Sequence, residues 1–186
     1  MEKYLDEALS TEERAEALTD LLTTEEQAAQ LRYDAPAVER LGIPAYNWWN
    51  EGLHGVARAG TATMFPQAIG LAAMFDTALT EKAAEITSIE ARAKYNAFSA
   101  HGDRDIYKGL TLWAPNINIL RDPRWGRGHE TYGEDPFLTA ENGKAFVRGI
   151  QGDRKTMRAA ACAKHFAVHS GPEKLRHEFN AEVSEK

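Results

Sequence analysis

The sequence predicts an α/β domain in which parallel strands alternate with helices. Strand-like runs near 111–114 and 158–165 alternate with helical patterns at 77–98 and 136–150. Strands that are separated by helices pair in parallel, because the crossover helix returns the chain to start the next strand in the same direction. A further observation is that charged residues gather just after the end of each predicted strand.

The composition is that of one globular domain. The 186 residues are 43% apolar and 27% charged, enough for a sizeable core. The net charge of −6 argues against a nucleic-acid partner, and no apolar run approaches the length of a membrane span. Cys162 is the single cysteine, so no internal disulfide is expected. The acidic N-terminus lacks the pattern of a signal peptide, so we expect a cytoplasmic protein.

The first 31 residues are expected to form leading helices, and residues 32–186 the βα units with their loops. Ser10 with Glu13 fits a capping box, and Thr24 with Gln27 fits a second, followed by a helix to about Leu31. Capping boxes satisfy backbone N–H groups that the first helical turn leaves without partners. Both helices are therefore predicted from local chemistry alone.

The next segment is expected to hold a short buried strand ending near Glu51. Gly42 and Pro44 exclude a long helix, and the aromatic run "AYNWWN" favours a strand. Residues 53–66 are rich in Gly and Thr and are predicted to be a loop, and "QAIGLAAMF" is predicted to be a short helix or an apolar strand.

Two longer helices follow, each with a recognisable start. Asp76 is a predicted N-cap for a helix over 77–98, and Asp135 with Pro136 begins a helix that runs to about Ile150. The inner side of the first of these helices is predicted to consist of Ala84, Ile86, Ile89, Ala93 and Ala97.

Three charged groups are predicted to meet on one face. Glu51 with His54, the segment 121–135, and Lys164 with His165 each stand at or after the C-terminal end of a predicted strand. In a parallel barrel those ends share one face, which is where sites are built.

A pocket with this lining suits a sugar. Arg, Lys and carboxylate side chains can each serve neighbouring hydroxyls, which both donate and accept hydrogen bonds. The segment "GRG" is neither a P-loop nor a dinucleotide motif, so a nucleotide is disfavoured. The side chains that could stack on a sugar ring are those of Trp48, Trp49, Trp113 and Trp125.

Structural interpretations of the same residues stay open. Arg121, Asp122, Arg124 and Glu130 could form an ion-pair cluster that holds a long loop. A histidine alone is more often structural than catalytic, whereas Lys164, at the end of an apolar strand, needs a partner, which favours a functional role.

Metal and thiol chemistry are not expected. His165 and His169 are spaced like a zinc pair, but the glutamate of such a motif and a third ligand are missing. Cys162 and His165 would point to opposite faces of a strand, and a lone cysteine in an apolar strand is normally part of the core.

Five segments in order closely resemble glycoside hydrolase family 3, in its β-xylosidase and β-glucosidase branches. They are "YNWWNEGLHGV", "FPQAIGLAAMFD", "APNINILRDPRWGRGHETYGEDPFL", "ACAKHFAVHSGPE" and "LRHEFNAEV". The resemblance runs from about Leu18 onward. It implies a TIM-barrel-type (β/α) domain and retaining hydrolysis of terminal β-linked xylose or glucose through a covalent glycosyl-enzyme, with no cofactor and no metal. The implied ligand is a β-linked oligosaccharide or aryl glycoside.

The resemblance also implies which residues bind the sugar at the −1 subsite. These are Glu51, Arg127, Lys164, His165 and Arg176. The residues expected to support them are His54, Asp122, Arg124 and Glu130. Many β-glucosidases have an aspartate at the place of Glu51, and the longer side chain leaves less room for a hydroxymethyl group. We therefore hypothesise a preference for a pentose such as xylose.

No catalytic residue of the family is expected within this chain. The family's nucleophile is an aspartate in a Ser-Asp-Trp-like segment, which does not occur here, and the acid/base comes later still. A full barrel takes roughly 250 residues, so about the first half is expected, a fragment that is inactive alone. It would need the rest of the barrel or another copy as partner. The alternative function is that of a non-catalytic sugar-binding or assembly remnant.

Overall fold

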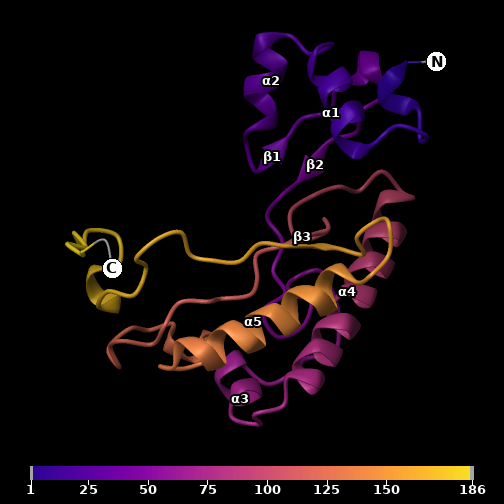
Figure 1. Cartoon of the computed structure of the whole chain (residues 1–186). Helices are drawn as coiled ribbons and strands as arrows, with labels where there is room; N and C mark the ends of the chain where they lie inside the picture. The colour runs from indigo at the N-terminus through magenta and orange to yellow at the C-terminus, as the bar shows by residue number, and fades with distance from the viewer. Residues whose placement is uncertain (1, 185–186) are drawn as a thin grey trace. The chain divides into compact units, whose positions relative to one another are not determined.

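The structure, a computed structural model, describes residues 2–184 and divides the chain into two compact units. The first ends at Asn47 and the second begins at Trp48. The course of the chain can be followed in Figure 1. The predicted leading segment, 1–31, falls within the first unit.

The first unit contains short helices and one small antiparallel sheet. In β1 (Asp34–Ala35) and β2 (Tyr46–Asn47), Asp34 pairs with Asn47 and Ala35 with Tyr46. Tyr4 connects the start of this unit to Leu41, because its hydroxyl donates to the Leu41 carbonyl over 2.8 Å. The helices are η1 (Lys3–Leu5), α1 (Thr11–Thr19), α2 (Thr24–Gln30) and η2 (Glu39–Leu41).

Both leading helices begin with a capping box, but one box lies a residue earlier than predicted. Ser10 and Glu13 cap α1 as expected. The cap of α2 is Thr23 with Glu26, so the predicted pair of Thr24 and Gln27 is wrong. The Gln27 side chain instead donates to the carbonyl of Thr19 over 3.0 Å, which links α2 back to α1.

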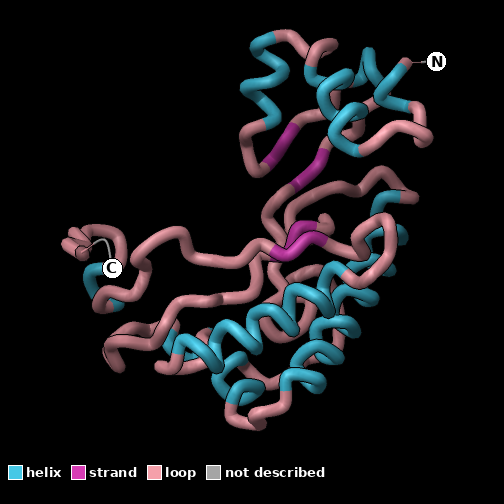
Figure 2. Tube along the Cα trace, viewed as in Figure 1, coloured by secondary structure: helices cyan, strands magenta, loops and turns pink. Residues whose placement is uncertain are grey.

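The second unit alternates helices with short parallel segments (Figure 2). Thr111 of β3 (Thr111–Leu112) pairs with Ala160 of β4 (Ala160–Ala161) in parallel. The helices are α3 (Ala68–Ala72), α4 (Thr77–Ser99), η3 (Gly128–Glu130), α5 (Pro136–Gln151) and η4 (Glu173–Leu175).

Isolated bridges extend the parallel pairing at both sides of β3. Asn50 pairs with Leu112, and Asn116 with Lys164, both in parallel. The predicted parallel order of three segments is therefore confirmed, although the regular strands are shorter than predicted. Pro115 has no N–H to donate to the ladder, so β3 ends before it. The predicted strand near Glu51 is reduced to β2 and the single bridge at Asn50.

Small side chains allow α4 and α5 to pack closely against each other (Figure 1). The Ser88 hydroxyl of α4 donates to the carbonyl of Gly149 in α5 over 3.1 Å, and Thr80 donates to the Asn142 side chain over 2.8 Å. Of the predicted inner side of α4, only Ala84 is buried, and Ile89 is 48% exposed. The prediction was wrong because α5 covers a face of α4 that is made of Ala, Ser and Thr.

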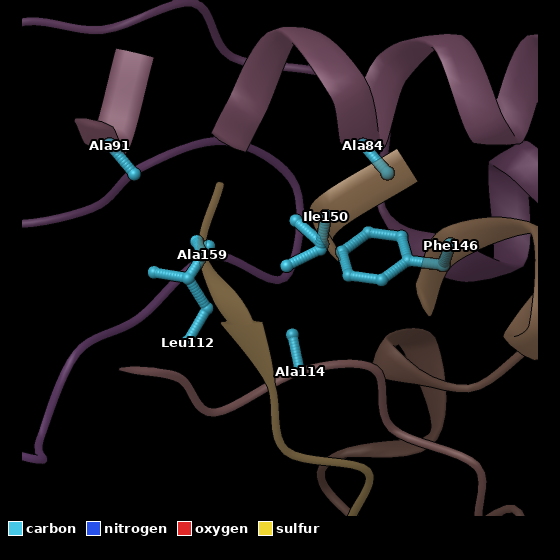
Figure 3. Close-up of a cluster of buried hydrophobic side chains, with 7 residues drawn as sticks. All are labelled: Ala84, Ala91, Leu112, Ala114, Phe146, Ile150 and Ala159. Atoms are coloured by element: carbon cyan, nitrogen blue, oxygen red, sulfur yellow. The ribbon is translucent and has the colours of Figure 1, made fainter. Parts of the chain in front are cut away.

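The core of the second unit lies between these two helices and the parallel segments. Phe146 and Ile150 of α5 point toward Ala84 of α4 and toward β3 (Figure 3). The buried cluster is completed by Ala91, Leu112, Ala114 and Ala159. The described part of the chain is therefore a partial α/β domain with few strands.

Two further outcomes concern single features. Cys162 is exposed, so its predicted place in the core is wrong. Within residues 2–184, no helix has the length and apolar character that a membrane span needs.

Candidate functional site

Arg127 stands at the centre of the candidate site. It lies at the start of η3, and its Nε and Nη2 atoms donate to the two carboxylate oxygens of Glu130 over 2.9 and 2.6 Å. Its Nη1 atom lies 3.0 Å from Nε2 of His165 and 3.4 Å from Nε2 of His169. One guanidinium thus joins the loop after β3 to the loop after β4.

Glu130 and Arg127 form a bidentate ion pair in a partly buried position. Their side chains are 14% and 23% exposed. Burial raises the pKa of the Glu130 carboxyl, but the hydrogen bonds and charge of Arg127, with the charge of Lys164, outweigh it and hold the pKa below its usual value. A bidentate pair fixes the plane of the guanidinium as well as its position.

Lys164 enters the site from the end of the parallel segment that begins with β4. Its backbone pairs with Asn116, and its carbonyl accepts from Ile117 N–H over 2.8 Å. Burial and the charge of Arg127 lower the pKa of its ammonium, while the charges of Glu130 and Glu51 oppose that shift. The lysine therefore stands among the predicted site residues, partly buried and surrounded by charge.

His165 is held from two sides. Asn118 Oδ1 lies 3.0 Å from the His165 backbone N–H and 2.8 Å from its Nδ1 atom, and Arg127 lies on the Nε2 side. Burial, followed by the charges of Arg127, His169 and Lys164, lowers the pKa of His165 to about 4. The ring is therefore neutral at neutral pH.

Asn118 and His169 were not among the predicted site residues. Asn116 and Asn118 alternate in "PNINI" directly after the predicted strand, and this spacing was a usable signal. From sequence spacing alone, His169 resembles a metal ligand. Burial, followed by the charges of Arg127 and Arg176, lowers its pKa, and its ring stands edge-on to Trp125 with centroids 5.9 Å apart.

The negative charge of Glu51 raises the pKa of Lys164, which places Glu51 near this site. Its own carboxylate accepts from Arg58 Nε over 2.9 Å, and the Arg58 side chain is 60% exposed. The Arg58 guanidinium lies 5.5 Å from the centroid of the Tyr107 ring. The Glu51 side chain is itself 33% exposed, so solvent reaches its carboxylate.

His54 has a structural arrangement. Its Nδ1 atom lies 2.8 Å from the carbonyl oxygen of Phe65, which only accepts, so Nδ1 donates. Its Nε2 atom then accepts from the Gln67 side chain over 3.2 Å. The Phe65 N–H donates back to the His54 carbonyl over 2.8 Å. His54 thereby closes the loop that follows Glu51.

Asp122 and Arg124 bind each other. The Asp122 carboxylate accepts from the Arg124 backbone N–H over 2.9 Å and from its guanidinium over 2.6 Å. These hydrogen bonds from Arg124 lower the pKa of Asp122 to about 2. In the described part of the chain, the side-chain hydrogen bonds of this pair do not include Arg127, which agrees with the interpretation that the pair holds the loop.

Arg176 lies on the last loop, just after η4. Its Nη1 atom lies 2.8 Å from Glu173 Oε1, and its charge contributes to the lowered pKa of His169. Glu173 in turn packs against Gly126, where an added Cβ would lie 2.8 Å from its carboxylate. The last loop is thus anchored to the loop that carries Arg127.

The four tryptophans have different surroundings. Trp49 and Trp113 stack on each other with centroids 4.8 Å apart, and Trp125 is 3% exposed. Trp48 is 45% exposed. An indole face that is already covered by another indole is not open to a sugar ring, so the solvent-facing Trp48 remains the most accessible of the four.

Cations and carboxylates therefore lie close together at this site. Arg127 and Lys164 supply donors, while Glu51 and Glu130 supply carboxylate acceptors. Neighbouring hydroxyl groups, which donate and accept together, match such a lining. Among residues 2–184, no three His, Cys, Asp or Glu side chains are grouped as metal ligands.

The chain matches known proteins along nearly its whole length. The family model "Glycosyl hydrolase family 3 N terminal domain" matches residues 13–184. A xylan 1,4-β-xylosidase of Xylanibacter ruminicola is 48% identical over 95% of this chain, and probable β-D-xylosidase 7 of Arabidopsis thaliana is 47% identical over 92%. A solved family 3 exo-β-xylosidase, in complex with a xylobiose aziridine activity-based probe, matches 94% of the chain with a TM-score of 0.82 and 37% identity.

The match covers only part of each relative. The chain spans 21% and 24% of the length of the two xylosidases and 23% of the solved structure. The family model spans residues 13–184, which include Arg127, Lys164 and His165. The chain therefore belongs to glycosyl hydrolase family 3 and represents its N-terminal domain.

Proposed function

We propose that this chain supplies part of the −1 sugar subsite of a retaining, exo-acting β-glycosidase that removes terminal β-linked xylose. The proposal rests on one observation. Arg127, Lys164 and His165 come from two separate loops and lie together around the bidentate ion pair of Arg127 and Glu130. The similarity to β-xylosidases supports the choice of sugar.

Each residue has a role that follows from its atoms. Lys164 donates to a hydroxyl as a compact cation, and Arg127, whose plane Glu130 sets, donates beside it. Glu51 accepts from a hydroxyl on the other side, and its carboxylate also accepts from Arg58 Nε. Two donors and one acceptor then orient a single sugar ring, which is the positioning that glycosidic cleavage requires.

The chemistry itself is proposed to come from outside residues 1–186. A retaining glycosidase uses two carboxyl groups roughly 5–5.5 Å apart, one as nucleophile and one as acid/base. In this proposal Glu51 and Glu130 serve neither role, since each carboxylate is bound to an arginine. The chain alone is therefore proposed to be inactive.

An apolar groove supports the further proposal that the domain is about half of a (β/α) barrel. The groove runs between α5 and the segments that follow β3 and β4. Its lining includes Ile117, Ile119, Ala140, Val147 and Ala163. An apolar surface of this kind is stable when another element covers it. We propose that the next βα elements of a complete barrel do so.

Turnover by a chimeric enzyme tests the proposed function. Residues 13–184 would replace the matching segment of the Xylanibacter ruminicola xylosidase. We expect the chimera to hydrolyse an aryl β-xyloside and the 186-residue chain alone to be inactive. Lys164→Ala should lower kcat/KM about 10- to 100-fold, because a hydrogen bond from a charged group is lost. Lys82→Ala, which removes an exposed lysine of α4, serves as the control.

Two outcomes would contradict the proposal. One is turnover by the 186-residue chain that depends on Lys164. The other is a folded chimera in which Lys164→Ala and Lys82→Ala behave alike. Binding of xylose by the chain, with a folded but inactive chimera, would instead favour a non-catalytic sugar-binding function.

Glu51→Asp in the same chimera tests the choice of sugar. The shorter side chain should admit a hydroxymethyl group, so the ratio of kcat/KM for aryl β-glucoside over aryl β-xyloside should rise about tenfold. An unchanged ratio would show that Glu51 does not determine the sugar preference.

A further inference from the structure

The Asn118 side chain makes two hydrogen bonds to one residue. Its Oδ1 atom lies 3.0 Å from the backbone nitrogen of His165 and 2.8 Å from Nδ1 of the same histidine. The backbone of Asn118 is held by Asn116, because the Asn118 N–H donates to Asn116 Oδ1 over 3.0 Å. The carboxamide therefore faces His165 in a defined direction.

These distances determine which atoms carry hydrogen. A backbone N–H can only donate, so the Asn118 atom that faces it must be the oxygen. The same oxygen can only accept, so Nδ1 of His165 must donate and carries the ring proton. The backbone N–H fixes the orientation of the amide, and the tautomer follows from that orientation together with the position of the ring.

The other ring nitrogen is determined in the same way. Nε2 of His165 lies 3.0 Å from Nη1 of Arg127, and a guanidinium nitrogen can only donate. Nε2 therefore accepts and carries no proton. The charged and titratable groups that face the ring are Arg127, Lys164, His169 and Glu130, of which only Glu130 favours a second proton.

We propose that Asn118 is a positioning residue that holds His165 as the neutral Nδ1–H tautomer, so that Nε2 stays an acceptor beside Arg127. A proton on Nε2 would bring two N–H groups face to face at 3.0 Å and push Arg127 away from its place against Glu130. Asn118 thus acts on the sugar subsite through His165. This last step rests on the proposed function, whereas the tautomer does not.

Nitrogen NMR of the 186-residue chain tests the tautomer directly. We expect the His165 signals, assigned with His165→Gln, to show a protonated Nδ1 and an unprotonated Nε2 near neutral pH. Asn118→Leu keeps the size of the side chain but removes the acceptor, so part of the population should move to the Nε2–H form. Asn96→Leu, at an exposed position of α4, should change neither signal.

Asn118→Asp is the second variant, because it keeps the acceptor and adds a negative charge. It should retain the Nδ1–H form and move the His165 titration midpoint to higher pH. A proton on Nε2 in the unaltered chain would overturn the proposal, as would a folded Asn118→Leu chain with unchanged signals. If Asn118→Leu does not fold, an unchanged midpoint in Asn118→Asp would overturn it.

Kinetics of the chimera test the step that concerns the sugar. Asn118→Leu should lower kcat/KM for an aryl β-xyloside roughly tenfold or more, by analogy with groups that orient metal-ligating histidines, and Asn118→Asp should recover part of it. Equal kcat/KM in all three would overturn the link to the subsite. An inactive chimera with the expected NMR signals would count against the proposed function and in favour of the positioning role.

Discussion

At the scale of single residues, the main feature is the number of cations around His165. Arg127 and Lys164 both disfavour a proton on its ring, and His169, which shares the Arg127 hydrogen bond, has a lowered pKa for related reasons. Burial is the largest cause of the lowered pKa at both rings. The site therefore contains two neutral histidines that act as acceptors for one arginine.

This arrangement predicts that stability depends on pH. Both imidazoles have a lower pKa in the folded chain than the usual 6.5, so the unfolded chain takes up protons first as the pH falls. The stability that the neutral imidazoles contribute should be fully present above about pH 6.5. It should decrease as the pH falls toward about 4, the pKa of His165 in the folded chain. Partial exposure screens the charges, so we expect a loss on the order of 1 kcal/mol, or about 2–4 °C in Tm.

Thermal unfolding between about pH 7.5 and pH 5 measures this effect. Carboxylates with lowered pKa values, such as Glu130, titrate below that window. His165→Gln should flatten the pH dependence, and His177→Gln, at an exposed position, should not. A Tm that rises as the pH falls through the window would be incompatible with the two neutral histidines.

At the scale of elements, the contact between α4 and α5 depends on one glycine. A Cβ added at Gly149 would meet the Glu81 carbonyl oxygen, and would lie 2.7 Å from the Cβ of Ala84. Both are rigid parts of α4, so neither can move aside cheaply. Gly143, two turns earlier in α5, meets only the Ile117 side chain at 3.3 Å.

The two glycines form a matched pair for substitution. Gly149→Ala should destabilise the chain by about 1–3 kcal/mol, because overpacking outweighs the gain in helix propensity. Gly143→Ala should be neutral or stabilising by up to about 1 kcal/mol, since Ile117 is 45% exposed and can shift. Denaturant unfolding of both variants provides the comparison, and equal effects would refute the close contact between the helices.

At the scale of the whole molecule, the apolar groove beside α5 is the feature with the largest consequence. Ile117, which is 45% exposed, lines this groove together with Ile119 and Val147. Exposed apolar patches of this kind promote association when the covering element is absent. We therefore expect the surface that the proposed complete barrel would bury to be an association site in the chain alone.

We accordingly predict that the 186-residue chain associates with itself as its concentration rises. Ile117→Asn should weaken the association, because it places an amide in the groove. Met157→Asn, at a position that is 52% exposed and away from the groove, should leave it unchanged. Sedimentation velocity over a concentration series measures the effect. Monomeric behaviour at every concentration would count against the groove as an association site.

The sequence by itself determined the features that depend on neighbours along the chain. The caps at Ser10, Asp76 and Asp135 bind N–H groups three residues away, so their residue types predict where α1, α4 and α5 begin. The alternation of helices and parallel segments followed from local patterns as well. The family followed from long contiguous motifs, such as the one that contains Arg127 and Glu130.

Only the tertiary structure decided the features that join distant segments. Asn118 and His165 are 47 residues apart, and no local pattern predicts that one orients the other. The inner face of α4 was mispredicted for the same reason, since α5 determines which side chains are buried. A helix cap depends on a hydrogen bond between residues three apart in the chain, whereas the partners of a loop side chain depend on where the whole fold brings each loop.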